Sequence, residues 1–278
     1  MIHKLIQKEY KKVHSLFAGP HLNLVIDAFV EGNSPGRIWV DDVVGPRTAF
    51  MWDKAHCYYL VGSAYNEKFN TELKKSIVKK IVPEAIEHNR FLFKVYYTSE
   101  VWESKIEAIF GTASPRKRER VLYTLQKLEI PEWRDKIPPG LCIRRIDGKL
   151  VKKTNLENID DVLSEIESCW NSVDDFLRNG FGFCLMHDRV IACWCTAEYV
   201  SGKKCGIGIE TAKEYRERGF AKLTTCAFVD YCISNNILPH WDSWKDNLPS
   251  IAVAEKIGFK KALDYAVYFG RFNKKNYF

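Results

Sequence analysis

Residues 209–223 read Ile209-Glu210-Thr211-Ala212-Lys213-Glu214-Tyr215-Arg216-Glu217-Arg218-Gly219-Phe220-Ala221-Lys222-Leu223. The stretch begins at the end of the strand-like segment 205–210 and leads into a helix expected from Gly219 to Ile233. The first amides of a helix lack intrahelical acceptors, and the helix dipole adds partial positive charge there. Gly219 and Ala221 let a diphosphate come close, while Arg216 and Arg218 add fixed charge. The stretch predicts an anion site, although the pattern Arg-x-x-Gly-x-Ala alone also fits an ordinary helix start.

Outward from this stretch, the second half of the chain alternates between strand-like and helix-like patterns. Apolar residues recur at helical spacing in four segments, and short apolar runs bounded by turn residues predict six strands. Their order is one strand, two helices, three strands, helix, strand, helix, strand. The expected helices are 156–170, 173–177, 219–233 and 248–257, and the expected strands are 141–146, 181–186, 190–195, 205–210, 238–242 and 265–272.

The first half repeats the run of three strands, helix, strand and helix, without a comparable glycine turn. We therefore expect an α/β (α+β) protein made of two tandem folds, each a mixed, mostly antiparallel sheet flanked by helices, with a degenerate first copy. The expected domains are 1–135 and 136–278, with the basic segment 114–120, interpreted as a solvated helix start, and the turn 137–140 between the two folds. The first-half strands are expected at 37–40, 49–52, 57–61 and 91–97, and the helices at 71–88 and through Trp102, Ile106 and Ile109.

The composition is typical of a soluble globular protein, with 46% hydrophobic and 28% charged residues. The formal net charge of +7 is spread along the chain, so it is a weak argument for nucleic acid and suits a polyanionic cofactor equally well. The first residues lack the apolar core of a signal peptide, and no apolar run approaches the ~20 residues that span a bilayer. We expect a cytoplasmic monomer or homodimer that binds neither nucleic acid nor membrane.

The nine cysteines are odd in number, scattered and without a Cys-x-x-Cys pair. This pattern argues against a disulfide framework or a zinc site, so we expect reduced, partly buried thiols and no bound metal. Cys193 and Cys195 are spaced to lie on one face of a strand, where core packing is a simpler interpretation than a reactive thiol.

Two motifs in this sequence resemble the signatures of the GNAT superfamily of N-acetyltransferases. Arg216, Gly219 and Ala221 match the acetyl-CoA signature Gln/Arg-x-x-Gly-x-Gly/Ala. Asn247-x-x-Ser250, followed by a helix that ends in Lys-Ile-Gly-Phe at 256–259, is similar to the second signature. The resemblance covers the chain from about Leu141 to Phe272. The layout of the whole chain, including Trp39-Val40-Asp41-Asp42, resembles the subfamily that contains zwittermicin-A resistance acetyltransferases.

The resemblance implies an enzyme that moves an acetyl group from acetyl-CoA to a primary amine by direct attack in a ternary complex. It also implies a sheet that opens between the strand of Ile207 and the strand of Leu238, with the pantetheine arm in the gap. Backbone amides near Ile209 and Thr211 would hold the pantetheine and polarise the thioester. The implied coenzyme contacts are Ile209, Thr211, Arg216, Glu217, Arg218, Gly219, Phe220, Ala221, Lys222, Asn247 and Ser250.

Direct attack needs a neutral amine, and a lysine-like amine with a pKa of about 10.4 is almost wholly protonated at neutral pH. A base is therefore required. Glu210 is the first candidate because it ends the coenzyme strand, and Asp242, on the opposing strand, is the second. The alternative for Glu210 is an exposed charge closing a strand, and the alternative for Asp242 is a structural hydrogen bond.

One departure concerns the acid that protonates the leaving thiolate. Many family members place a tyrosine four residues before the glycine of the second signature, where this chain has Ala254. A thiol pKa of about 8.5 makes the thiolate a tolerable leaving group, so loss of that acid need not abolish turnover, although the identity of the acid is left open. Tyr265 and Tyr268 are possible substitutes, with aromatic packing as their alternative role.

Several alternatives stay open at the level of sequence. The missing tyrosine also permits a non-catalytic acyl-CoA sensor, and the bases of residues 116–120 permit nucleic-acid binding. We expect a small-molecule amine as acceptor, with a protein lysine or N-terminal amine as alternatives. Asp41, Asp42, Asp242 and Asp246 could attract a cation, but the sequence does not bring them to one cleft. The first copy would cap the acceptor side or mediate association.

Overall fold

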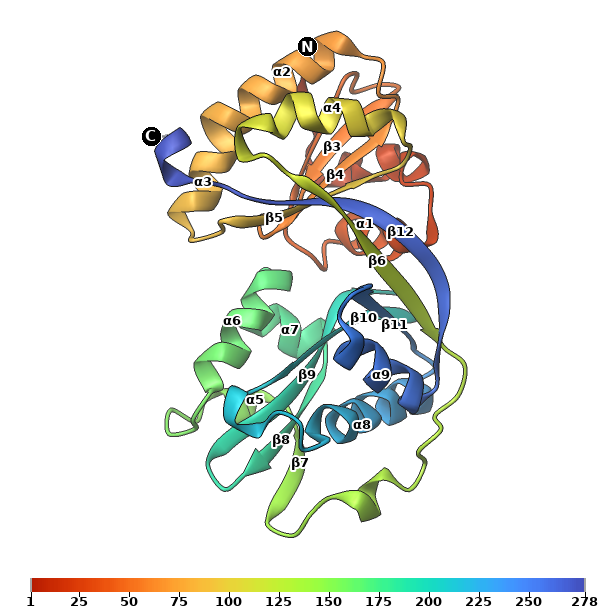
Figure 1. Cartoon of the computed structure of the whole chain (residues 1–278), viewed down its shortest axis with the longest axis vertical. Coiled ribbons are helices and arrows are strands. Elements are labelled where there is room, and N and C mark those ends of the chain that lie inside the picture. Colours follow the sequence, from red (N-terminus) through yellow and green to blue (C-terminus); the bar gives the residue numbers. More distant parts are fainter. Residues whose placement is uncertain (1, 278) are drawn as a thin grey trace. The chain divides into compact units, whose positions relative to one another are not determined.

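The computed structural model describes residues 2–277 and divides into two compact units (Figure 1). Unit 1 comprises Met1–Glu119 with Tyr265–Phe278, and unit 2 comprises Arg120–Asp264. These bounds differ from the expected domains 1–135 and 136–278. The difference arises because strand β12, Phe259–Arg271, begins in unit 2 and pairs its last residues, from Tyr268 onward, with strand β5 of unit 1.

Unit 1 is a mixed sheet covered by helices, as Figure 1 shows. Its strands lie in the order β1-β2-β3-β4-β5-β12, and β4 with β5 is the parallel pair in an otherwise antiparallel arrangement. A π-helical turn joins α2 to α3, so the helix expected at 71–88 is continuous but begins earlier. The bounds are β1 His3–Lys4, η1 Gln7–Leu16, α1 Pro20–Glu31, β2 Arg37–Val40, β3 Thr48–Trp52, β4 Cys57–Gly62, α2 Glu67–Ser76, η2 Ile77–Ile81, α3 Val82–Glu87, β5 Leu92–Tyr97, α4 Val101–Phe110 and η3 Gly111–Ala113.

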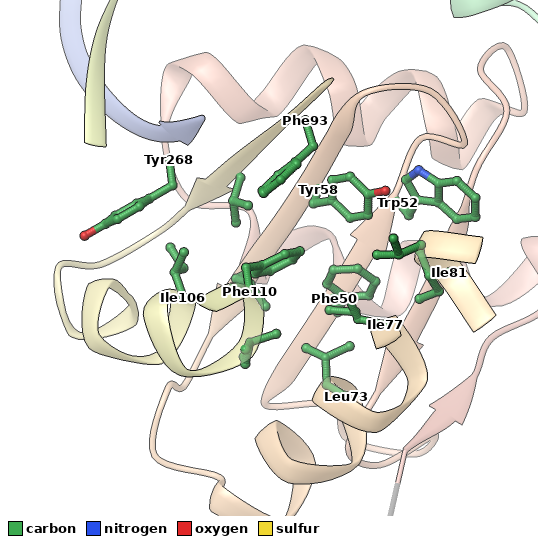
Figure 2. Packing of buried hydrophobic residues seen from close by; sticks show 14 of the residues in the cluster. Phe50, Trp52, Tyr58, Leu73, Ile77, Ile81, Phe93, Ile106, Phe110 and Tyr268 are labelled. Carbon is green, nitrogen blue, oxygen red and sulfur yellow. The ribbon is translucent and has the colours of Figure 1, made fainter. Parts of the chain in front are cut away.

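The core of unit 1 is rich in stacked aromatic rings (Figure 2). The rings of Phe93 and Phe272 stack with centroids 4.2 Å apart, and Tyr58 meets Phe93 and Phe110 edge-on. Such pairs add about 0.5–1.5 kcal/mol each beyond area burial. Tyr268 belongs to the same cluster and is 5% exposed. The C-terminal segment is therefore an integral part of the unit 1 core.

Unit 2 is also a mixed sheet, with strand order β6-β11-β10-β9-β8-β7 and one parallel pair, β10 with β11. Asp188, with a φ of 53°, forms the turn of the predicted β8–β9 hairpin. The bounds are β6 Arg116–Leu125, η4 Trp133–Lys136, β7 Leu141–Arg145, α5 Gly148–Val151, α6 Ile159–Cys169, α7 Val173–Asn179, β8 Gly182–His187, β9 Val190–Ser201, β10 Lys204–Thr211, η5 Lys213–Tyr215, α8 Phe220–Ser234, β11 Leu238–Trp244 and α9 Leu248–Ile257; the 3-10 turn η6, Lys274–Asn276, belongs to unit 1.

The predicted fold class and tandem repeat are confirmed. Each unit runs through three antiparallel strands, a helical layer, a strand parallel to the third, and another helix. The expectation of a solvated helix start at 114–120 is wrong, because Arg116 opens strand β6, which continues into the buried run Val121–Tyr123. Helix α1, whose inner face is buried, was not predicted from the sequence.

Candidate active site

The parallel strands of unit 2 separate partway along their length. Strand β10 pairs with β11 at three positions, from Lys204 with Leu238 to Gly206 with His240. Beyond that point β10 continues beside β9 to Thr211, and β11 continues beside β6 to Trp244. Each strand thus continues for at least four residues beyond the last residue pair that joins β10 to β11. This is the opening that the resemblance implied between the strands of Ile207 and Leu238.

Strand alternation identifies the backbone groups that face this opening. The Leu238 amide donates to the Lys203 carbonyl at 2.8 Å, so odd-numbered residues of β10 direct their backbone groups toward β11. Beyond Gly206 these residues are Ile207, Ile209 and Thr211. The Thr211 carbonyl accepts from Arg216 Nε at 3.1 Å. Ile209 and Thr211, predicted to hold the pantetheine, therefore have their backbone groups on the side where β11 has separated.

Helix α8 begins without a side-chain cap. Its N-cap, Gly219, has a φ of +78°, and a Cβ there would meet nothing within 4 Å. Glu217, two residues earlier, also has a positive φ, 63°. Among residues 2–277, no acceptor satisfies the amides of residues 220–222. Such turns gather backbone N–H groups into an anion-binding concavity, and a helix start adds its dipole.

The side chains around this helix start divide into two kinds. Arg216, Glu217, Arg218 and Gly219 are exposed, whereas Phe220 is 6% exposed and packs inward. Arg218 lies over the ring of Tyr215 at 5.3 Å. Phe220 can therefore offer an anion its backbone amide alone, while the arginines offer guanidinium groups. Ala221 and Lys222 are half-buried in the first turn of the helix.

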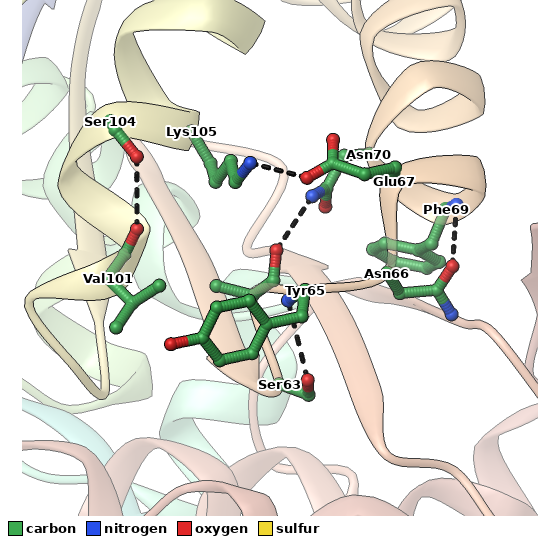
Figure 3. Close-up of polar contacts among 10 residues, drawn as sticks. Ser63, Tyr65, Asn66, Glu67, Phe69, Asn70, Val101, Ser104 and Lys105 are labelled. Atoms are coloured by element: carbon green, nitrogen blue, oxygen red, sulfur yellow. Dashed lines mark hydrogen bonds and ion pairs between the residues drawn. The ribbon is translucent and has the colours of Figure 1, made fainter.

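Among its described residues, 2–119 and 265–277, unit 1 lacks both of these features. Its parallel pair, β4 with β5, is paired at four positions, ending at Leu60 with Tyr97, and the Thr98 amide extends the ladder to the Leu60 carbonyl. Helix α2 is capped because Asn66 Oδ1 accepts from the Phe69 amide at 3.0 Å (Figure 3). In the copy predicted to be degenerate, β4 and β5 therefore stay paired to the end of β5, and a side chain already caps the start of α2.

Glu210 lies beside the first signature. Its Oε1 accepts from Arg216 Nη2 at 3.0 Å, and both side chains are about half exposed. The other carboxylate oxygen of Glu210 has no hydrogen-bond partner in the described chain, 2–277. The structure thus places this candidate base on the rim of the opening, in an ion pair with Arg216.

Asp242 is held by a buried arginine. Arg120 donates to Asp242 Oδ1 through Nε at 2.7 Å and through Nη2 at 2.6 Å. The Arg120 guanidinium also lies 4.6 Å from the centre of the Trp244 ring, and its side chain is 9% exposed. This arrangement favours the structural alternative for Asp242 over the role of base. The pairing of Asp242 with Arg120 was not predicted, because Arg120 lies in the segment 114–120, which was expected to be a solvated helix start.

The second signature forms the start of helix α9. Asn247 is its N-cap, and Asn247 Oδ1 accepts from the Ser250 amide at 3.3 Å. Ser250 Oγ in turn accepts from Trp241 Nε1 at 3.1 Å. Both predicted coenzyme contacts therefore stabilise the local fold in unit 2. Ala254, at the position of the family's tyrosine, is fully buried.

Tyr265 and Tyr268 lie in unit 1. Tyr265 stacks on His21 with ring centroids 4.2 Å apart, and Tyr268 packs beside Tyr97. Both rings thus serve aromatic packing, the alternative role. Two more basic residues of the 116–120 segment have partners within unit 1, since Lys117 pairs with Glu103 and Arg118 lies over Phe269.

One half-buried carboxylate over the sheet of unit 2 was not predicted from the sequence. Glu165, on helix α6, accepts from Trp194 Nε1 at 2.7 Å and from Thr196 Oγ1 at 3.1 Å. Burial raises the pKa of the Glu165 carboxyl, and the negative charge of Glu210 raises this pKa further. The available signal was the glycine alternation Gly206-x-Gly208 in β10, which leaves room for such a side chain.

The separated parallel strands and the uncapped, glycine-bearing helix start define the class of site expected for a coenzyme A-dependent acyltransferase. The model of the GNAT acetyltransferase family matches residues 14–268. The chain therefore belongs to the GNAT acetyltransferase family, and it is an N-acetyltransferase of a family that uses acetyl-CoA as co-substrate.

Known proteins are similar to this chain over almost its whole length. An uncharacterised N-acetyltransferase of Bacillus subtilis strain 168, YdfB, is 25% identical over 269 residues, covering 97% of this chain and 98% of the relative. A GCN5-related N-acetyltransferase-like protein of Streptococcus suis has a similar crystal structure, with a TM-score of 0.72, 20% identity, and coverage of 95% of this chain and 99% of that one. A tandem GNAT protein from the clavulanic acid biosynthesis pathway gives a TM-score of 0.59 at 14% identity, covering 98% of both chains. The two structures support the tandem fold.

Within residues 2–277, none of the helices has the length and apolar character needed to cross a bilayer. The same residues bring together no group of three histidine, cysteine, aspartate or glutamate side chains that could hold a metal ion.

Proposed function

We propose that this enzyme transfers the acetyl group of acetyl-CoA to a primary amine of a small molecule, by direct attack in a ternary complex. The observation that carries the proposal is the uncapped start of α8 beside the separated strands β10 and β11. In this proposal the pyrophosphate binds the amides of residues 220–222 with Arg218 and Lys222, and the pantetheine follows the backbone of Ile209 and Thr211.

The finer assignments remain proposals of the same kind. Glu210 and Asp242 are the carboxylates that the sequence offers as base, and in the structure each pairs with an arginine. Asp41, offered as a cation attractor, instead closes a loop, since its Oδ1 accepts from the amides of Asp42, Arg47 and Thr48. The link to zwittermicin-A resistance enzymes, the cytoplasmic location and the oligomeric state likewise stay predictions.

Calorimetry with coenzyme A and acetyl-CoA tests the coenzyme site. Gly219→Glu places a carboxylate where the diphosphate would bind, on a residue with positive φ and open space around it. Loss of two charge-assisted hydrogen bonds of about 1.5 kcal/mol each corresponds to an affinity about a hundredfold lower. Gly202→Glu is the matched control, because Gly202 also has a positive φ, +52°, with nothing within 4 Å of its Cβ position. Equal coenzyme affinity in both variants would contradict the proposed site.

A further inference from the structure

The face of the unit 2 sheet that meets helix α6 carries a carboxylate directly against a glycine backbone. We propose that Glu165 is the catalytic base, which takes the proton from the acceptor's ammonium group over Gly208. This inference rests on the proposed function. It replaces Glu210 in that role by a residue on helix α6.

The geometry around Gly208 supports this assignment. A Cβ at Gly208 would lie 2.5 Å from Glu165 Oε1, 2.6 Å from Glu198 Oε1 and 3.0 Å from Thr196 Oγ1. The Glu165 carboxylate therefore occupies space that any other residue at position 208 would fill. Gly206, the next residue on that face of the strand, is likewise approached by Glu198, whose carbonyl oxygen lies 3.2 Å from the Cβ position. The two glycines leave this part of β10 without side chains, so the carboxylates of Glu165 and Glu198 can lie directly over the strand's backbone.

This position is adjacent to the proposed thioester. Gly208 directly precedes Ile209, and consecutive Cα atoms are about 3.8 Å apart. The Ile209 backbone faces the opening where the pantetheine is proposed to lie. A nitrogen held beside Glu165 is therefore within a short distance of the carbonyl that it attacks.

The partners of Glu165 distinguish it from the other candidates. Glu210 pairs with Arg216 and Asp242 pairs with Arg120, whereas Glu165 accepts from a neutral indole N–H and a neutral hydroxyl. These two donors fix the carboxylate without cancelling its charge, so the charge remains available to an ammonium ion.

The groups that face Glu165 are mostly acidic. Glu198 on β9 and Glu210 on β10 lie toward it from the sheet. On helix α7, which also packs against α6, Asp175 is paired with Arg178. Burial raises the pKa of the Glu165 carboxyl. A base is most effective when its pKa approaches the operating pH.

The proposed reaction transfers one proton to Glu165 and one to the leaving sulfur. The Glu165 carboxylate takes one proton from the ammonium, which leaves a neutral nitrogen. That nitrogen attacks the thioester carbon, so a C–N bond forms and the C–S bond breaks. The second nitrogen proton goes to the departing sulfur, which gives the amide and the coenzyme A thiol. The proton on Glu165 returns to solvent before the next turnover.

The test compares three variants of the full chain, Glu165→Gln, Glu210→Gln and the control Glu167→Gln, which changes an exposed carboxylate on the same helix. Free-thiol release from acetyl-CoA is measured with alkylamines, polyamines, amino sugars and aminoglycosides, and with hydroxylamine, which is largely neutral at pH 7. For the amine that the parent acetylates fastest, Glu165→Gln should lower kcat/KM by about 10²-fold or more and remove the acidic limb of its pH profile. With hydroxylamine as acceptor, the kcat/KM of Glu165→Gln should fall much less. The affinity of this variant for coenzyme A should not change.

A second variant guards against a folding defect. Gly208→Ala retains Glu165 but places a methyl group against its carboxylate, so it should lower kcat/KM in the same direction without changing coenzyme A affinity. The inference would be overturned if Glu165→Gln kept the parental kcat/KM and pH profile while Glu210→Gln lost both. That result would leave the proposed function intact. Absence of turnover of every amine by the parent would instead overturn the proposed function, and the inference with it.

Discussion

The ion pair between Arg120 and Asp242 provides a quantitative test of the structure. In Arg120→Met, the carboxylate of Asp242 loses the guanidinium that donates to it twice. Breaking a buried ion pair from one side costs about 3–5 kcal/mol. The Asp242 side chain is 30% exposed, so water recovers part of this cost, and we expect about 2–3 kcal/mol. Loss of the stacking on Trp244 adds about 0.5–1 kcal/mol, which gives a total of about 3 kcal/mol.

Urea unfolding followed by circular dichroism measures this loss as a change in the free energy of unfolding. The matched control is Lys127→Met, because Lys127 pairs with Glu129 at 3.4 Å with both side chains exposed, and such pairs contribute about 0–1 kcal/mol. In a double-mutant cycle, Asp242→Asn should make the Arg120→Met change much smaller. A loss below about 0.5 kcal/mol for Arg120→Met, or additive effects in the cycle, would refute the structural role of Asp242.

Two further predictions concern stoichiometry and thiol reactivity. Because the β4–β5 ladder is closed and Asn66 caps α2, calorimetry should find one coenzyme A bound per chain; two equivalents would contradict the closed first copy. Cys142 is the exposed thiol among the nine, whereas burial raises the pKa of Cys193 and of Cys226 to about 11, which suppresses their nucleophilic thiolate. Iodoacetamide should therefore alkylate Cys142 first in the native protein, as mass spectrometry can follow, and rapid native labelling of Cys193 would disagree with its burial.

Local sequence patterns were sufficient to predict most helices and strands in the second half of the chain. Helix α9 was predicted with its observed bounds, Leu248–Ile257, because Asn247 and Gly258 are strong start and stop residues. Strand β6 was missed because its first residues, from Arg116, are charged, and a charge run has no strand periodicity. Its buried end becomes a strand through pairing with β11, which lies more than a hundred residues away in the sequence.

The coenzyme side of the site was easier to foresee than the catalytic side. The amides of residues 220–222 belong to one local motif, so the spacing of Arg216, Gly219 and Ala221 was enough to suggest them. Glu165 could not be assigned in this way, because an acidic residue on an amphipathic helix ordinarily faces solvent. Its environment is created by Trp194, Thr196 and Gly208, which the fold brings to it from two other elements.

The path of strand β12 has a consequence for biosynthesis. Residues 265–277 leave the ribosome after Asp264, yet they complete the core of the unit that is synthesised first. Until Phe272 arrives, the ring of Phe93 lacks its stacking partner and the edge of β5 lacks its neighbour. The N-terminal half thus finishes folding only after translation of the segment, and a nascent chain arrested near Asp264 would expose an unfinished sheet edge to aggregation.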